Sequence, residues 1–293
     1  MKAWPVLCGA IAIFLATSVQ AEEFSVLSYN THGLPSWIAG DDPEARFPEI
    51  AGRTDTYDVV LLQEDFRHHE LLRRRTSHAT VRRGNQSLKS WCPFCSGSGL
   101  TLLVRWKTLI ELANTAYGSC AGWIGGANDC LADKGFQIAR LRLPGGAELS
   151  FVNTHLDAGT SDADFEARRR QLDSLGAAIA ERGADSAVIV GGDFNLNAAV
   201  ERDARLLRQF TESLGLANTG ARARPGSDWS VLDYLFFRSG GGVTLDVLEA
   251  GEDESFVFGG APLSDHPPIF ARFQVRPITT KPSASSTSPR PPE

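Results

Sequence analysis

The sequence predicts an α/β fold (of the α+β kind), a four-layer sandwich in which two mixed β-sheets pack face to face and helices cover their outer sides. Two observations favour this fold. Predicted strands outnumber predicted helices in the 293-residue chain. Some strands follow one another through short turns, as in hairpins, while others are joined by helices. We expect one domain of this kind at residues 22–276.

Both ends of the chain differ from this domain. Residues 1–21 are typical of a signal peptide, because Lys2 gives a positive start, residues 6–17 are apolar and Val19-Gln20-Ala21 suits a cleavage site. The apolar run is short for a bilayer, and a retained membrane anchor is the alternative. Residues 277–293 are rich in Pro, Ser and Thr, which predicts a disordered tail. We therefore expect a secreted or periplasmic protein with no transmembrane segment.

The net charge of −6 argues against broad electrostatic binding to nucleic acid. One basic cluster remains, formed by Arg73, Arg74, Arg75, Arg82 and Arg83. It is either a solvated helix face and loop or a contact for an anionic surface. Nucleic acid therefore stays among the candidate partners.

Four cysteines follow the signal peptide, and an even number in an exported protein favours disulfides. We expect the pairs Cys92–Cys95 and Cys120–Cys130, because each closes a short local loop. The Cys-x-x-Cys segment could instead be a redox pair or half of a zinc site, although no second such segment exists.

The first half of the chain alternates short apolar runs with polar segments. Strands are predicted at residues 24–30, 57–64, 99–106 and 109–117. Helices are predicted at residues 43–53, capped by Asp41 or Asp42, and at residues 68–75. The strands at 99–106 and 109–117 are expected to pair as a hairpin. Residues 76–98 and 114–134 are expected to be loops.

The second half begins with a predicted hairpin, residues 135–143 and 148–154. Further strands are predicted at residues 187–190, 231–238 and 269–275. A helix at residues 161–182 has Ser161 as its cap and Asp164 three residues on. A second helix, capped by Asn197, carries an apolar stripe that ends at Leu214.

The run at residues 187–190 ends in Gly191 and Gly192, followed at once by Asp193 and Asn195. In extended geometry these two polar side chains point the same way, and their oxygens suit a hard cation or a phosphate. The alternative is an Asx turn that closes the strand.

Polar residues recur at predicted strand ends throughout the chain. They are Asn30, Glu64, His155, Asp193, Asn195, Asp233, Asp265 and His266. If the strand ends converge, these residues form a pocket of oxygen ligands with two imidazoles. Such a pocket suits Mg²⁺ or Mn²⁺, or else Ca²⁺. Zinc is disfavoured because no His-Glu-x-x-His signature is present.

Six segments resemble, in order, the motifs of the endonuclease/exonuclease/phosphatase superfamily, which has the DNase I-like fold. They are Ser28-Tyr29-Asn30, Leu62-Gln63-Glu64, Asn153-Thr154-His155-Leu156, Gly192-Asp193-Phe194-Asn195, Leu232-Asp233-Tyr234 and Ser264-Asp265-His266-Pro267. Within this superfamily, the chain is most similar to secreted bacterial neutral sphingomyelinases. The supporting segments are Lys134-Gly135-Phe136, Leu156-Asp157-Ala158, residues 169–172 and Leu34-Pro35.

The resemblance implies a role for each residue. Glu64 and Asn30 would bind the metal, and Asp265 would complete the shell of metal and water. Asp193 and Asn195 would orient the scissile phosphate and the attacking water. His266 would be the general base, and Asp233 would hold its tautomer. His155 would donate a hydrogen bond to the phosphoryl oxygens, and Lys134 would contact phosphate.

Each role has a structural alternative. Asp233 could close a turn, His155 and His266 could be packed histidines, and Lys134 could be a solvated loop residue. We expect the remaining histidines to be surface residues. They are His32, His68, His69 and His78.

The resemblance implies a secreted, Mg²⁺-dependent phosphodiesterase that acts on phospholipid headgroups, and we expect a monomer. The region before Ser264 is short and acidic where sphingomyelinases usually present an aromatic hairpin. Trp37 and Ile38 could supply another apolar edge. A DNase I-like endonuclease, a phosphomonoesterase on soluble phosphates and a non-catalytic binding module are the alternatives.

Overall fold

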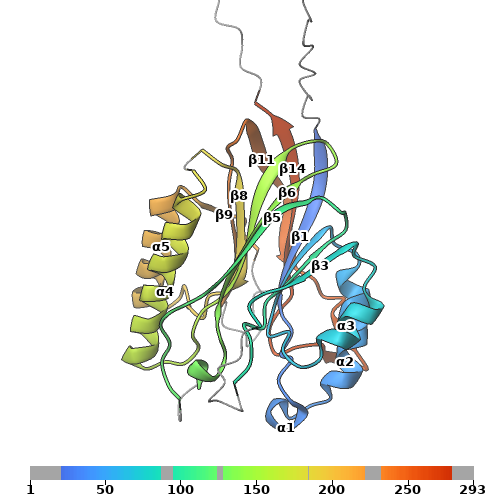
Figure 1. The fold of residues 1–293 in the computed structure, drawn as a ribbon, viewed down its shortest axis with the longest axis vertical. Helices are drawn as coiled ribbons and strands as arrows, with labels where there is room; N and C mark the ends of the chain where they lie inside the picture. Colours follow the sequence, from blue (N-terminus) through green and yellow to red (C-terminus); the bar gives the residue numbers. More distant parts are fainter. Residues whose placement is uncertain (1–20, 87–94, 124–127, 184, 222–231, 279–293) are drawn as a thin grey trace, which may run out of the picture.

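The computed structural model describes residues 21–86, 95–123, 128–183, 185–221 and 232–278. Two six-stranded sheets lie face to face at the centre of this part of the chain (Figure 1). Helices α2 (Pro43–Thr54) and α3 (His69–Arg75) lie outside the first sheet, and α4 (Asp162–Ala180) and α5 (Glu201–Leu214) lie outside the second. The predicted four-layer sandwich is therefore confirmed.

The first sheet has the strand order β11-β14-β1-β2-β4-β3. Its strands are β1 (Glu22–Asn30), β2 (Val59–Gln63), β3 (Thr80–Arg83), β4 (Thr101–Val104), β11 (Val243–Glu252) and β14 (Ile269–Pro277). Strands β1 and β2 run parallel, and every other neighbouring pair is antiparallel. The predicted mixed sheet is thus present, with one parallel pair at its centre.

The second sheet repeats this plan in the order β5-β6-β7-β8-β10-β9. Its strands are β5 (Leu109–Ala116), β6 (Gly135–Arg142), β7 (Glu148–His155), β8 (Val188–Asp193), β9 (Ala217–Asn218) and β10 (Asp233–Arg238). Strands β7 and β8 form the central parallel pair, and α4 makes the crossover between them. The remaining elements are α1 (Ser36–Ala39), the 3₁₀-helix η1 (Asp129–Leu131) and a small hairpin of β12 (Val257–Phe258) and β13 (Ala261–Pro262).

Three apolar clusters hold the layers together. One fills the space between the sheets and includes Phe24, Leu61 and Phe151. The second packs α4 and α5 on the second sheet, and the third packs α2 and α3 on the first. Because successive side chains of a strand point to opposite faces, each central strand supplies two of these clusters at once.

Several local predictions are confirmed. The side chain of Asp42 accepts a hydrogen bond from the amide of Ala45 and caps α2. Ser161 and Asp164 form a reciprocal capping box at the start of α4. Strands β6 and β7 form the expected hairpin, and the predicted disulfide joins Cys120 to Cys130.

The predicted pairing of residues 99–106 with 109–117 is wrong. Strand β4 pairs with β2 and β3 in the first sheet, whereas β5 pairs with β6 in the second. The short connection between them crosses from one sheet to the other. An alternating strand pattern fits any partner, so the short spacing misled the prediction.

Four other local predictions need correction. The expected loop at residues 76–98 contains the edge strand β3. Strand β11 and the four-residue helix α1 were not predicted. Val200 occupies the cap position of α5, because Asn197 instead accepts a hydrogen bond from the amide of Ala199 within a turn of its own.

Some predictions fall on residues outside the described part. These are the signal peptide up to residue 20, the Cys92 half of the Cys92–Cys95 pair and residues 279–293. Among the described residues, no helix has the length and apolar character needed to cross a membrane.

Candidate active site

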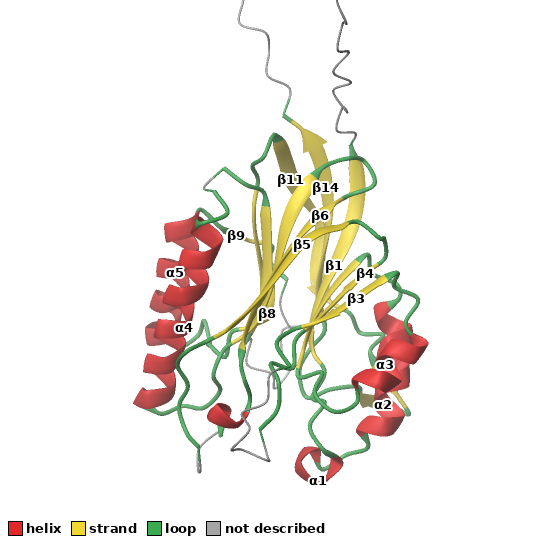
Figure 2. Cartoon of the chain, in the orientation of Figure 1, coloured by secondary structure: helices red, strands yellow, loops and turns green. Residues whose placement is uncertain are grey.

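The side chains that face the space between the sheets change character along each central strand. On β7 the inward row runs from Leu149 and Phe151 in the apolar cluster to Asn153 and His155. On β1 it runs from Phe24 and Val26 to Ser28 and Asn30 in the same two-residue steps. These polar residues lie toward the C-terminal ends of β1 and β7, where the strands meet their loops, and the C-terminal end of β1 points to the lower end of the molecule in Figure 2.

Register brings three predicted site residues together in the second sheet. His155 on β7 lies opposite Asp193 on β8, and Asp193 lies opposite Asp233 on β10. Residues directly opposite each other in a sheet share one face, so these three side chains converge. All three are buried.

Gly191 and Gly192 allow β8 to pack closely against its surroundings at this point. A Cβ atom at Gly191 would lie 2.7 Å from side-chain carbons of Leu61, in the facing sheet, and Leu235. A Cβ atom at Gly192 would collide with the backbone of Thr154 on the neighbouring strand β7 of the same sheet. Gly191 therefore permits the close approach of the facing sheet, and Gly192 permits the close pairing with β7.

Hydrogen bonds cross between the two sheets beside this row. Asn30 Nδ2 donates to Asp193 Oδ2 at 3.0 Å. One step deeper, Gln63 Nε2 donates to Asn153 Oδ1 at 2.8 Å, and Asn153 Nδ2 donates to the carbonyl of Leu62 at 2.9 Å. These bonds fix the relative position of the two strand ends that carry the candidate site.

Glu64 follows β2 in the left-handed backbone region, with a φ of 55°. This turn aims its side chain back into the site, 4.0 Å (Oε1) from His155 Nε2. Its Oε2 atom is buried and accepts no hydrogen bond. Burial raises the pKa of Glu64, while the charges of Lys134 and His266 act in the opposite direction.

His266 lies in the loop before β14 and reaches across to the second sheet. Its Nδ1 atom lies 2.8 Å from Asp233 Oδ2, and its Nε2 atom lies 3.7 Å from Asp193 Oδ2. Burial by itself would lower the pKa of His266, but Asp233 and Asp193 outweigh it and raise the pKa to about 11. Asp233 thus orients the ring and favours its protonated form.

The second imidazole of the site behaves in the opposite way. His155 Nε2 lies 3.4 Å from Asp193 Oδ2, and its Nδ1 atom is buried without a hydrogen-bond partner. Burial lowers the pKa of His155 well below its ordinary value, and the positive charges of Lys134 and His266 lower it further. Burial also raises the pKa of Asp193, to about 6.

Asn195 does not continue the strand, so the expected extended geometry of Asp193 and Asn195 is wrong. Strand β8 ends at Asp193, and Asn195 has a φ of 50°. The amide of Asn195 donates to Asp193 Oδ1 at 2.9 Å, which is the Asx turn considered as the alternative. Asn195 Nδ2 donates to the carbonyl of Leu156 at 3.0 Å. Asp193 and Asn195 therefore form the turn and also belong to the candidate site.

Lys134 is buried and is not the solvated residue considered as the alternative. Its ammonium donates to the carbonyl of Leu156 at 2.8 Å and lies 2.5 Å from Asp129 Oδ1. Its charge still acts on Glu64, His155 and Asp193. Any contact with a phosphate would have to compete with Asp129.

His32 belongs to the site, although the sequence indicated a surface residue. Its Nδ1 atom lies 3.2 Å from Asp265 Oδ2 and 4.0 Å from Glu64 Oε2. Its position two residues after Asn30, at a strand end, was the signal that could have revealed it. Asp265 is half exposed at the rim, where Ser264 donates to its Oδ1 atom at 3.3 Å.

Two other histidines are also not surface residues. His69 is buried, and its Nδ1 atom lies 2.5 Å from Asp65 Oδ2. His78 is buried, and its Nε2 atom lies 3.0 Å from the carbonyl of Tyr57. Their hydrogen bonds support α3 and the loop after it, and neither ring is among the converging site residues.

The donor set fits a divalent cation. Glu64 offers a buried carboxylate oxygen that accepts no hydrogen bond, with further oxygens on Asn30 and Asp265. Asp193, Asp233 and His266 form a second group, whose candidate ligand atoms all lie within 4.8 Å of one another. Asp233 Oδ2 already holds His266 Nδ1, whereas Glu64 Oε2 and Asp233 Oδ1 accept no hydrogen bond.

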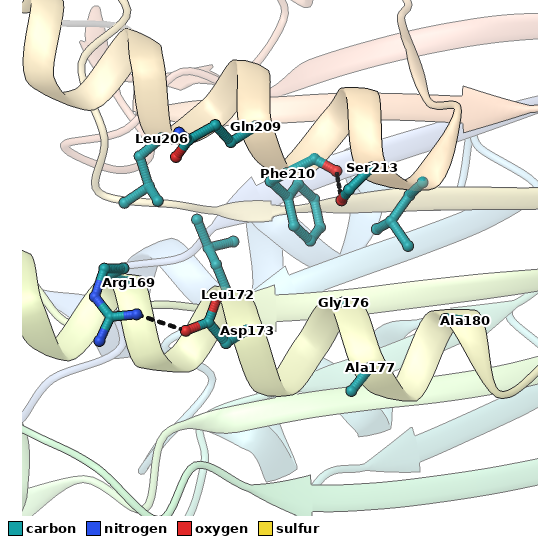
Figure 3. Close-up of a pocket in the computed structure, with 11 residues that line it drawn as sticks. Arg169, Leu172, Asp173, Gly176, Ala177, Ala180, Leu206, Gln209, Phe210 and Ser213 are labelled. Carbon is teal, nitrogen blue, oxygen red and sulfur yellow. Dashed lines mark hydrogen bonds and ion pairs between the residues drawn. The ribbon is translucent and has the colours of Figure 1, made fainter.

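A separate groove of about 480 Å³ lies between α4 and α5 on the outer face of the second sheet (Figure 3). Its walls include Leu172, Gly176 and Phe210, and an ion pair between Arg169 and Asp173 lies at one end. None of the predicted site residues lines it. The groove is therefore separate from the place where the predicted site residues converge.

The sequence of the chain is similar to that of known proteins. Residues 27–266 match the endonuclease/exonuclease/phosphatase family. Sphingomyelinases from Mycobacterium tuberculosis and Mycobacterium bovis are 31% identical over 280 residues, which cover 88% of this chain and 54% of theirs. The chain thus spans about half the length of the curated relatives that it matches.

Solved structures share the fold at low sequence identity. Sphingomyelinase C from Streptomyces griseocarneus is 22% identical, with a TM-score of 0.63 over 86% of this chain and 99% of that one. A beta toxin variant from Staphylococcus aureus, solved with bound magnesium ions, is 16% identical, with a TM-score of 0.66 over 85% and 99%. Together with the family match, these findings confirm the resemblance noted in the sequence: the chain belongs to the endonuclease/exonuclease/phosphatase family.

Proposed function

We propose that the protein is a secreted, divalent-metal-dependent phosphodiesterase that hydrolyses the headgroup of phospholipids, in the manner of a sphingomyelinase or phospholipase C. One observation carries the proposal. The buried Glu64 oxygen that accepts no hydrogen bond lies at the same end of the sandwich as an Asp233–His266 pair that faces Asp193. A cation ligand and an oriented proton acceptor are the two devices that metal-assisted attack of water on a phosphodiester needs.

Glu64, Asn30 and Asp265 would hold the cation, for which we propose Mg²⁺, with Mn²⁺ or Ca²⁺ as substitutes. Such a cation offsets the negative charge that builds up on the phosphate and on the leaving oxygen. His155, Asp193 and Asn195 would orient the phosphoryl oxygens and the water. Lys134 would contribute positive charge near His155, as its effect on the pKa of that ring indicates.

His266 would remove the proton from the attacking water through Nε2, with Nδ1 held by Asp233. With no cation present, the pKa of about 11 keeps His266 protonated at neutral pH. That value depends on the negative charges around the ring. Neutralisation of nearby carboxylates by a bound cation would lower the pKa of His266 and free its Nε2 atom to act as a base.

The relatives support the same class of reaction. The matched mycobacterial proteins are named sphingomyelinases, and one solved relative holds magnesium ions. Export is supported by the predicted signal peptide and by the Cys120–Cys130 disulfide, since disulfides persist in oxidising compartments.

The test is the release of phosphocholine from sphingomyelin in detergent micelles, with Mg²⁺ and with EDTA. We expect release with Mg²⁺, none with EDTA, and a loss of at least about 10²-fold in Glu64→Gln. Plasmid DNA and a soluble phosphomonoester are assayed in parallel. Nicking of DNA without release of phosphocholine would replace the proposal with an endonuclease.

A further inference from the structure

Helix α1 stands away from the body of the protein. It consists of Ser36, Trp37, Ile38 and Ala39, and none of these residues is buried. Trp37 is 80% exposed and Ile38 is 51% exposed. The backbone amides of Ile38 and Ala39 donate hydrogen bonds to the carbonyl of Pro35. The amide of Gly40 donates to the carbonyl of Ser36, and these bonds close the turn. The apolar side chains of α1 therefore make no contribution to the core.

The helix lies at the end of the molecule that carries the candidate active site (Figure 1). Only a short loop separates it from Asn30, and that loop contains His32. Helix η1 lies at the same end, on the side of the second sheet. The loop before η1 carries Trp123, which is 42% exposed. Exposed tryptophans thus occur on the segments that flank the site from both sheets.

The charges around α1 are negative. Residues 36–49 contain four acidic side chains and a single basic one, Arg46. Arg46 is buried, where it pairs with Asp41 at 2.8 Å and donates to the carbonyl of Leu263 at 2.6 Å. Asp42 and Glu44 are exposed beside the helix. An anionic surface would be repelled here, whereas a cationic group would be attracted.

We propose that α1 contacts the surface of a lipid bilayer whose headgroups carry choline as a phosphate ester. Trp37 and Ile38 enter the headgroup region, where tryptophan is favoured because its ring is amphipathic. The outermost group of such a headgroup is a quaternary ammonium, which binds to aromatic faces and is attracted by acidic side chains. The inference rests on the proposed function, since it explains how a lipid phosphodiester reaches the site.

The test compares the double variant Trp37→Ala/Ile38→Ser with a matched control, Ile110→Ser. Ile110 is 40% exposed on β5, where the start of the strand pairs with the end of β6, away from the site. No residue of α1 is buried, so the double variant should fold normally. Flotation with phosphatidylcholine vesicles in EDTA measures binding without turnover. A second set of vesicles contains phosphatidylserine.

We expect wild type and Ile110→Ser to bind phosphatidylcholine vesicles equally and the double variant to bind at least about fivefold less, as the loss of two interfacial side chains predicts. Phosphatidylserine should weaken the binding of wild type. Equal binding by the double variant, or tighter binding of wild type to phosphatidylserine vesicles, would overturn the proposal.

Turnover separates this inference from the proposed function. Hydrolysis of bis(p-nitrophenyl) phosphate, which needs no bilayer, should be the same in wild type and the double variant, while hydrolysis of vesicle lipid should fall. If vesicle lipid is hydrolysed equally well by both, the contact surface is refuted and the function stands. If wild type binds vesicles through α1 but hydrolyses no phosphodiester, the function is refuted and the surface stands.

Discussion

The two ends of the space between the sheets are built from the same strands and differ only in the side chains that face inward. At one end, Phe24 and Phe151 pack edge to face with ring centroids 6.0 Å apart. At the other end, Asn30 and His155 occupy the same rows of the same strands. The apolar end gains free energy from burial, whereas the polar end buries groups that lack full hydrogen bonding.

This difference shows that the fold tolerates a loss of folding free energy at the polar end. Glu64 and Asp193 have raised pKa values because they are buried, and His155 has a lowered one for the same reason. A site with such shifts is expected to serve chemistry and to reduce stability. The comparison therefore predicts that changes at the apolar end reduce stability and changes at the polar end reduce activity.

Phe151→Ala should have the largest effect on stability. Phe151 is fully buried between the sheets, and its removal should cost about 3–5 kcal/mol in the free energy of unfolding. Urea denaturation followed by fluorescence measures this cost. At a temperature where the variant is folded, its kcat should stay near that of wild type. A large loss of kcat with little loss of stability would break the contrast between the two ends.

His266→Gln should have the converse effect at the polar end. Loss of the proton acceptor should lower kcat by about 10²–10⁴-fold, because a positioned general base contributes this much. With Mg²⁺ bound, the free energy of unfolding should change less than in Phe151→Ala. In EDTA at neutral pH the variant should also lose the stabilising charge pairing with Asp233 and Asp193 that raises the pKa of His266. Retention of a tenth or more of the wild-type kcat would mean that another group accepts the proton.

Asn153→Ala tests the boundary between the two ends. Asn153 bonds Gln63 and the carbonyl of Leu62 in the facing sheet, and the substitution removes both bonds from the buried interior. We expect a cost of about 1–3 kcal/mol in the free energy of unfolding. KM and kcat should both change, since the bonds align the strand ends. A variant as stable as wild type would show that these bonds do not join the sheets.

Glu64→Gln should give the smallest change in stability, and in the opposite direction. Burial raises the pKa of Glu64 above 4.5, so its charge destabilises the folded state at pH values above that range. The variant should therefore have a higher Tm than wild type at pH 7.5 in EDTA, and the gain should vanish near pH 4. Addition of Mg²⁺ should raise the Tm of wild type only. A lower Tm of the variant at pH 7.5 would contradict the expectation that the charge of Glu64 destabilises the folded state.

Much of this arrangement was predictable from the sequence. The period of two along residues 24–30, 148–155 and 187–193 places Asn30, His155 and Asp193 on the inward faces of their strands. The predicted residues Asn30, Glu64, His155, Asp193, Asp233 and His266 do converge at one end. Local signals sufficed for these residues because each lies at the end of a strand or within a few residues of one.

The failures were non-local. The partner of β5 depends on a crossover between sheets that a short connection does not reveal, and β3 and β11 are edge strands with partly exposed, weakly alternating sequences. His32 was missed because only the fold brings it to Asp265, which is more than 200 residues away. The left-handed turns at Glu64 and Asn195 were missed because their residue types do not demand them.

We propose that the polar end of the sandwich uses a cation held by Glu64 to cleave phosphodiesters. The direct test is the initial rate of phosphodiester hydrolysis as free Mg²⁺ is raised from a chelator-buffered zero, with wild type and Glu64→Gln measured side by side. We predict a saturable rise from zero for wild type and a Mg²⁺ requirement at least about 100-fold higher for the variant. Full wild-type activity in the chelator, or two superimposable curves, would contradict the account.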